Sequence, residues 1–307
     1  MTFRRARHPN SSGGVSGTII AVESFRSWDG TELAYRAVGS GPPLVCIPGG
    51  PGQAVEYLGE LGGLGSRRTL ILLDNRGTGA SRVPADPATY RVDRLLDDVE
   101  ALRQHLGFDR MDLFGHSASG GTCLLYAARH PGRLTHLVLV APSLRVVGLP
   151  SDLDVDSVLA RRAHEPWHAA AVAALHAEPT TPEEQQRYRW QAAPLLYGRW
   201  SSAAQAQAAA EPAQFASAAT DGFYAGFEPD PALPARLAEF TVPTLLVAGE
   251  HDIWPTAAAV RQLAALFGNV DMVTQPESGH FPWVDDPAVF AASVEEFLSR
   301  CRAARSG

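Results

Sequence analysis

The sequence contains no lysine, and all of its 26 basic residues are arginines. Without a lysine amine, Schiff-base catalysis and the phosphate-binding lysine of a P-loop are both excluded. The 33 acidic residues leave a net charge of −7 at pH 7, and the arginines form no basic stripe. We therefore do not expect nucleic acid to be a partner of this protein.

Cysteine is also scarce, since the chain has only Cys46, Cys123 and Cys301, which lie far apart. This spacing indicates neither a disulfide framework nor a zinc knuckle, and it fits a reducing compartment. Residues 1–17 are basic but lack the apolar segment of a signal peptide, so we expect a flexible N-terminal tail. No apolar run approaches the roughly 18 residues that a membrane-spanning helix needs. We expect a cytoplasmic protein that does not enter a membrane.

Apolar residues, in contrast, make up 45% of the chain, which is enough for a large core. Strand-like apolar runs alternate with helical patterns, and the runs read GTIIAVESF, ELAYRAV, PLVCIPG, TLILLD, RMDLFG, LTHLVLVA, VPTLLVAGE and VDMVTQ. The first two flank an Asp29-Gly30 pair, which is typical of a hairpin turn. Short β-rich runs that alternate with helices indicate a mostly parallel sheet covered by helices on both faces.

The alternation of strands and helices stops between residues 145 and 235. This segment is rich in Ala, Gln, Glu and Pro, and it shows helical patterns over 155–177 and 183–218 without a convincing strand. We expect 145–235 to form a helical cap over the C-terminal edge of the sheet. The core of the fold is then expected from 18–144 and 236–307 together.

The stretch "LFGHSASGG" takes an apolar strand through a Gly-x-Ser turn into a helix, and it contains Ser117 and Ser119. Such a turn presents a serine Oγ at a sharp elbow, and its neighbours must be small because the backbone is crowded there. The helix that follows offers free N–H groups to a developing oxyanion. By itself the pattern also fits an ordinary turn whose serine caps the helix, a reading that suits Ser119 well.

A base and an acid for a catalytic triad follow two later strands. Asp252 comes after the run VPTLLVAGE, and His280 comes after the next run, VDMVTQ. We predict that His280 takes the Ser117 proton while Asp252 orients the imidazole and stabilises its charged form. His116, inside the elbow, is expected to be structural, and His251 is expected to face away from its neighbour Asp252.

The loop "CIPGGPGQ" follows another strand and is rich in glycine, which lets a backbone N–H turn toward a substrate oxygen. We predict that the N–H groups of Gly50 and Ala118 form the oxyanion hole. The segment "DNRGTGAS" is expected to be a structured turn. Acyl transfer by these groups requires neither a metal nor an organic cofactor.

Together, "GGPG", "DNRGTGAS", the serine elbow, "GEHD" and "SGHFPWVDDP" resemble the α/β-hydrolase fold over roughly residues 18 to 302. The resemblance is closest to the proline iminopeptidase-like serine peptidases of family S33. It implies a mostly parallel, eight-stranded sheet flanked by helices, with a helical cap inserted.

The resemblance also favours Ser117 over Ser119. Hydrolases of this type commonly carry a His-Pro pair about fourteen residues beyond the nucleophile, and His130-Pro131 fits that distance only when the count starts at Ser117. Two positions depart from the family pattern. Pro48 stands where a histidine usually precedes "GGPG", and Ser119 stands where a glycine is common, so the first departure weakens strict proline iminopeptidase identity.

Members of this family bind the free α-ammonium group of their substrate with glutamates of the cap. In this chain, residues 145–235 contain eleven acidic residues and six arginines, a net charge of −5. Such a cap favours a cationic aminoacyl group. Glu211 is the first candidate for this contact, with Glu228 behind it, although either one also fits a solvated helix face.

Three functions remain open at this point. The first is a serine aminopeptidase that releases proline or another small N-terminal residue from a short peptide or an aminoacylated metabolite. The second is a carboxylesterase, thioesterase or lactonase that uses the same three residues, because the fold does not select the leaving group. The third is a ligand-binding protein that keeps the fold without turnover. The oligomeric state is left open by the sequence.

Overall fold

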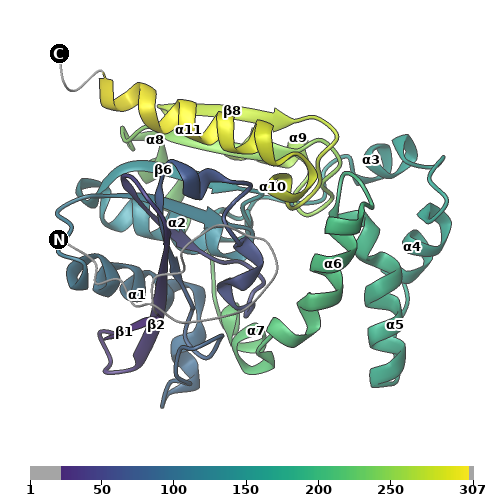
Figure 1. The fold of residues 1–307 in the computed structure, drawn as a ribbon, viewed down its shortest axis with the longest axis horizontal. Coiled ribbons are helices and arrows are strands. Elements are labelled where there is room, and N and C mark those ends of the chain that lie inside the picture. Colours follow the sequence, from purple (N-terminus) through teal and green to yellow (C-terminus); the bar gives the residue numbers. More distant parts are fainter. Residues whose placement is uncertain (1–21, 304–307) are drawn as a thin grey trace.

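One eight-stranded sheet with helices on both faces forms the centre of the molecule (Figure 1). The computed structural model describes residues 22–303, with side chains as far as residue 300. The predicted N-terminal tail, residues 1–17, lies outside the described residues. Among those described, no helix is both long enough and apolar enough to cross a membrane.

The sheet is mostly parallel, as predicted. Its strands lie in the order β1-β2-β4-β3-β5-β6-β7-β8. Both pairs that involve β2 are antiparallel, and all other neighbours are parallel. The strands are β1 Glu23–Arg26, β2 Glu32–Gly39, β3 Pro43–Ile47, β4 Thr69–Leu73, β5 Met111–His116, β6 Leu134–Val140, β7 Thr244–Gly249 and β8 Val270–Gln275.

Each face of the sheet is buried under its own set of helices. Side chains of a strand alternate between the faces, so Val45 and Ile47 face one core cluster while Leu44 and Cys46 face the other. The first cluster is covered by α1 Val92–His105, α2 Ala118–Arg129, α8 Leu233–Ala238 and α9 Ala257–Ala264. The second is covered mainly by α11 Pro287–Ala303, which follows the short helix α10 Pro282–Asp285. Burial on both faces explains why strands β3 to β7 are continuous apolar runs rather than alternating ones.

The segment predicted to be a cap is helical and projects to one side of the core (Figure 1). Its helices are α3 Val155–Arg161, α4 His168–Leu175, α5 Pro182–Ala192, α6 Ser202–Ala210 and α7 Ser217–Phe223. They are shorter than the predicted helical stretches 155–177 and 183–218. Pro166 separates α3 from α4, and Gly198 lies between α5 and α6, since both residue types interrupt helices.

The C-terminal border predicted for the cap, residue 235, falls inside helix α8. Leu233 and Leu237 of this helix are fully buried in the core cluster that also contains α2. Short 3₁₀ helices complete the chain: η1 Val55–Leu58, η2 Leu64–Ser66, η3 Pro87–Tyr90, η4 Pro131–Arg133, η5 Arg145–Val147, η6 Ala193–Leu196 and η7 Glu211–Gln214.

Candidate active site

Ser117 occupies a sharp turn between strand β5 and helix α2. Its backbone has φ 51° and ψ −123°, a conformation that residues with a side chain rarely adopt. Close packing explains the glycines around it: a Cβ on Gly115 would lie 2.6 Å from the Cys123 sulfur, and a Cβ on Gly49 would lie 2.7 Å from the Ser117 Cβ. The turn therefore holds the Ser117 side chain in a defined direction at the end of the sheet.

Three side chains form one hydrogen-bonded chain at this end. The Nε2 atom of His280 lies 2.9 Å from the Ser117 Oγ, and its Nδ1 lies 2.9 Å from the Asp252 Oδ2. Asp252 is fully buried, and its other oxygen accepts from the backbone N–H of Trp254 at 2.8 Å. Because a carboxylate only accepts, Nδ1 carries the proton and Nε2 accepts from the Ser117 hydroxyl. This arrangement suits transfer of the Ser117 proton to His280.

The second serine of the elbow takes no part in this chain. Ser119 is fully buried in the first turn of α2, and its Oγ lies 3.4 Å from the side-chain nitrogen of Asn75. The same Asn75 nitrogen donates to the backbone oxygen of Pro48 at 3.2 Å. Ser119 therefore lies under the loop that follows β3 and away from His280.

The two predicted oxyanion donors, Gly50 and Ala118, both lie next to Ser117. Gly50 lines the same cavity as Ser117 and has a φ of 117°, which favours glycine. Ala118 is the first residue of α2, where a helix leaves its N–H groups without an internal partner. Within residues 22–303, neither backbone N–H has a hydrogen-bond acceptor. Both remain available to a substrate oxygen.

The cap is bonded to both loops of this site. Beside the loop that carries Gly50, the Ala54 N–H donates to the Gln214 oxygen at 2.9 Å, and the Ala216 N–H donates to the Gly52 oxygen at 2.9 Å. At the other loop, the His280 N–H donates to the Leu196 oxygen at 2.7 Å.

The carboxylate of Asp285 also joins the cap to the histidine loop. One of its oxygens accepts from the N–H groups of Gly198 in the cap, at 2.9 Å, and Gly279 in the loop, at 2.8 Å. The cap segments η6 and 214–216 therefore form fixed walls of the site.

The "DNRGTGAS" segment is a turn, as predicted. Asp74, which is fully buried, accepts from the N–H groups of Val55 and Ala80, both at 3.0 Å. Fully buried Arg76 pairs with Asp98 and Asp29. This turn supports the loop after β3 and does not line the cavity at Ser117.

Ser117 opens onto a cavity of about 220 Å³. Three of its lining residues are aromatic and the others are mostly polar or small; the lining residues are Gly50, Gln53, His116, Ser117, Leu196, Glu211, Phe215, Trp254, His280 and Phe281. Pockets that hold drug-sized ligands are larger, at about 300–1,000 Å³. The cavity therefore suits a small acyl group.

Of the two predicted cap glutamates, the structure brings only Glu211 to the site. Burial raises the pKa of Glu211, while the nearby Arg189 and His280 act in the opposite direction. Glu211 and Arg189 also line an adjoining cavity of about 210 Å³, and the Arg189 guanidinium lies 5.6 Å from the Phe215 ring centre. Glu228 is exposed in the loop after α7 and lines neither cavity.

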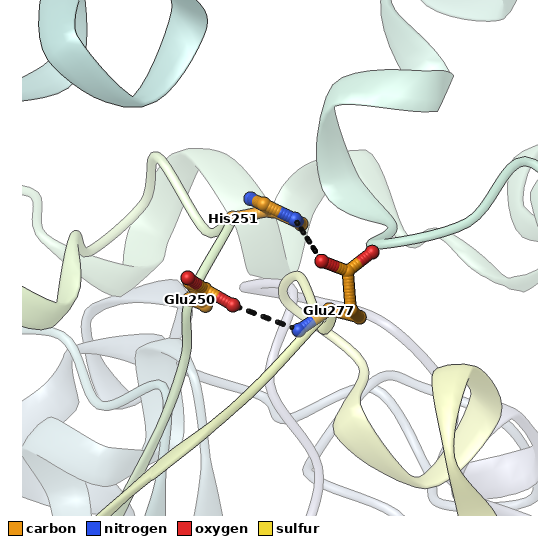
Figure 2. Close-up of side chains that lie close together, drawn as sticks. All are labelled: Glu250, His251 and Glu277. Atoms are coloured by element: carbon orange, nitrogen blue, oxygen red, sulfur yellow. Dashed lines mark hydrogen bonds and ion pairs between the residues drawn. The ribbon is translucent and has the colours of Figure 1, made fainter. Parts of the chain in front are cut away.

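Glu250, His251 and Glu277 form a cluster beside the site, with one potential metal-ligand atom from each within 4.8 Å of the others (Figure 2). The His251 Nε2 lies 3.7 Å from a Glu277 oxygen, and the Glu250 carboxylate accepts from the Glu277 N–H at 3.0 Å. Burial, and then the charge of Arg162, lower the pKa of His251. That arginine charge opposes a bound cation, whereas the Glu250–Glu277 hydrogen bond ties the Asp252 loop to the His280 loop without one.

Comparison with known proteins identifies the family of this chain. A family model described as the alpha/beta hydrolase fold matches residues 42–287. The chain belongs to this family. The reactions of hydrolases in this family are therefore the ones to expect of this chain.

Individual relatives within the family differ in their named activity. A proline iminopeptidase of Lactobacillus helveticus is 35% identical over 125 residues, which cover 38% of this chain and 42% of that protein. This chain thus matches less than half of that relative's length. A putative carbamate hydrolase, RutD, of Caulobacter segnis is 27% identical over 80% of this chain and 87% of that protein. The solved structure of proline iminopeptidase from Mycobacterium smegmatis superposes with a TM-score of 0.73 at 22% identity, over 93% of this chain and all of that one.

Proposed function

We propose that this protein is a serine hydrolase that cleaves the amide bond after a free N-terminal residue. Its substrate is a short peptide or an aminoacylated metabolite that begins with proline or another small residue. The observation that carries the proposal is the hydrogen-bonded chain Ser117–His280–Asp252, which opens onto a small cavity walled by Glu211. The similarity of part of the chain to a proline iminopeptidase supports the same substrate class.

In the first half of the reaction, the Ser117 Oγ attacks the substrate carbonyl carbon and its proton passes to the His280 Nε2. Asp252 stabilises the resulting imidazolium through Nδ1. The tetrahedral oxyanion accepts from the N–H groups of Gly50 and Ala118. The C–N bond then breaks, and His280 donates its proton to the departing amine, which leaves an ester on Ser117.

In the second half, a water molecule loses a proton to His280 and attacks the ester carbon. The C–O bond to Ser117 breaks as His280 returns the proton to the serine oxygen. The released product is the free amino acid. Both halves use the same two N–H donors and the same histidine, so no metal or organic cofactor is required by this mechanism.

Recognition of the amine is assigned to Glu211. Its carboxylate lies at the cavity wall in a partly buried position, where an ammonium partner is worth more than it would be in water. The aromatic walls formed by Phe215, Trp254 and Phe281 suit the flat, apolar face of a proline ring.

The test compares proline p-nitroanilide with N-acetylproline p-nitroanilide and p-nitrophenyl acetate, for the wild-type protein and Glu211→Gln. We expect the free-amine amide to be hydrolysed, and Glu211→Gln to raise its KM about tenfold while the KM of the ester changes little. If esters are turned over and no free-amine amide is, the proposal is wrong. An unchanged KM in Glu211→Gln removes the role assigned to that residue.

A carboxylic ester, thioester or lactone hydrolase is the second candidate. The observation that favours it is Arg189, whose charge near Glu211 offsets part of the attraction for an ammonium group. Similarity to a putative carbamate hydrolase over most of the chain is also consistent with a different acyl group. The same substrate comparison separates the two. Failure of a fluorophosphonate to label Ser117 would instead favour a non-catalytic binding protein.

A further inference from the structure

The backbone segments that carry the proposed catalytic groups meet at one buried side chain, that of His116. Its Nδ1 lies 2.7 Å from the Tyr57 hydroxyl, and its Nε2 lies 2.9 Å from the backbone oxygen of His280. The Tyr57 hydroxyl also lies 2.5 Å from the backbone nitrogen of Gly49. His116 itself directly precedes Ser117, so the ring contacts the loop of His280 and, through Tyr57, the loop of Gly50.

The donor and acceptor of each hydrogen bond follow from the chemistry of the groups. The His280 carbonyl only accepts, so the Nε2 of His116 carries a proton. Burial, followed by the charge of His280, lowers the pKa of His116 well below its usual value, so the ring is neutral and Nδ1 is an acceptor. Tyr57 therefore donates its O–H to Nδ1 and accepts the Gly49 N–H on the same oxygen. One ordered chain runs from Gly49 through Tyr57 and His116 to His280.

The surroundings of this chain are buried and aromatic. The Tyr57 side chain is 5% exposed and His116 is 1% exposed. The Tyr57 ring packs against Phe281 and Trp283, with ring centres 5.9 and 6.2 Å apart. Burial raises the pKa of Tyr57 well above its usual value, so the hydroxyl keeps the proton that it donates. In such surroundings, a lost hydroxyl leaves a buried donor and a buried acceptor without partners.

We propose that Tyr57 is a positioning residue that, through His116, holds the loop of Gly50 and the loop of His280 in place around Ser117. Tyr57 contacts no reacting atom in this role. The proposal rests on the proposed function only in so far as Ser117 is the nucleophile, and it holds for an amide or an ester substrate alike. Tyr57 affects the positions of the oxyanion donor and the base. Its removal is therefore expected to weaken transition-state stabilisation more than substrate binding.

The test is Tyr57→Phe, which removes the hydroxyl and keeps the ring. We expect kcat to fall on the order of ten- to a hundredfold, with KM changed less than threefold. The affinity for phenylboronic acid, whose tetrahedral adduct on a serine resembles the transition state, is expected to fall by the same factor as kcat. The matched control is Tyr126→Phe: Tyr126 is also fully buried, and it donates to Glu100 at 2.8 Å away from the site. This control is expected to lower thermal stability and to leave kcat and boronate affinity unchanged.

A wild-type kcat in Tyr57→Phe overturns the proposal, and so does a loss of kcat with unchanged boronate affinity. A loss of kcat equal to that of Tyr126→Phe also overturns the proposal, because both losses would then reflect general destabilisation. If Tyr57→Phe does not fold, His116→Gln decides, since glutamine keeps an N–H donor at the ε position for the His280 carbonyl but has no acceptor atom at the δ position that faces Tyr57; it is expected to lower kcat and boronate affinity together. The substrates are first compared with the wild-type protein, and kcat is then measured with a substrate that the wild-type protein hydrolyses. If none is, the rate of fluorophosphonate labelling of Ser117 replaces kcat, which separates failure of this proposal from failure of the proposed function.

Discussion

Replacing Gly49 by alanine adds one methyl group at the closest contact between the loop after β3 and the serine turn. The new Cβ would lie 2.7 Å from the Ser117 Cβ and 2.8 Å from the His116 backbone oxygen. Two carbon atoms attract at roughly 3.5–4.0 Å, so the loop has to retreat by about 1 Å. A misplacement of about 1 Å in a reacting site costs on the order of a hundredfold in rate, equivalent to about 2.7 kcal/mol of transition-state stabilisation. We therefore expect kcat of Gly49→Ala to fall about a hundredfold.

The assay measures kcat for steady-state hydrolysis of the best substrate, and circular dichroism monitors thermal unfolding of the same variants. The matched control is Gly132→Ala, because a Cβ at Gly132 meets no atom within 4 Å. This control is expected to keep the wild-type kcat. Wild-type kcat in Gly49→Ala would refute the claim that the loop must lie against Ser117. A loss of kcat in both variants would refute the steric argument as well.

Three further predictions concern Asp252, Glu211 and Asp285. Asp252→Asn is expected to lower kcat by about 10⁴-fold with little change in KM, measured by steady-state kinetics, because its oxygen stays with the Trp254 N–H and its NH2 group donates to the His280 Nδ1, which puts the imidazole proton on Nε2; a loss below tenfold would contradict the role of Asp252. Burial raises the pKa of Glu211, so the stability that this residue contributes is present when it is protonated and is lost as the pH rises through its folded-state value. Glu211→Gln is therefore expected to raise the melting temperature at pH 7 but not below pH about 4, and an equal shift at both pH values would contradict this account. Asp285→Asn is expected to lower the free energy of unfolding by about 1–3 kcal/mol in urea titrations, because the NH2 group that replaces one oxygen cannot accept, so either the bonds from Gly198 and Gly279 or the bond from the Arg199 N–H is lost; unchanged stability would show that this link between cap and core contributes nothing.

The sheet could be predicted from the sequence because its signals are local. The central strands are buried on both faces and are short apolar runs, while the edge strands β1 and β8 were visible as β-rich segments beside turns. The turn residues of the serine elbow lie next to one another in the chain. The meeting of Asp252 and His280 with Ser117 could be inferred because consecutive parallel strands end at the same edge of a sheet.

The cap was predictable in its helical content but not in its detail. Pro166 and Gly198 lie in the segments between its helices, and where the helices end on either side of them depends on how each helix packs. Net charge also could not distinguish Glu211 from Glu228, since only the folded chain places the former at a cavity and leaves the latter exposed.

Tyr57 carries no sequence signal at all. It lies in the short helix η1, and it reaches His116 from 59 positions away in the chain. His116 could be predicted to be structural, but the identity of its partners depends on how two loops fold over one another. Contacts between distant segments of this kind are set by tertiary packing, which residue spacing does not encode.

The central claim, that Ser117 is the nucleophile of a serine hydrolase, is tested most directly by labelling with a fluorophosphonate followed by peptide mass mapping. The serine oxygen attacks phosphorus and fluoride leaves, so the label remains on the activated serine. We predict a single label on Ser117 that disappears in Ser117→Ala and persists in Ser119→Ala. A label on Ser119, or an unlabelled protein, would contradict the account.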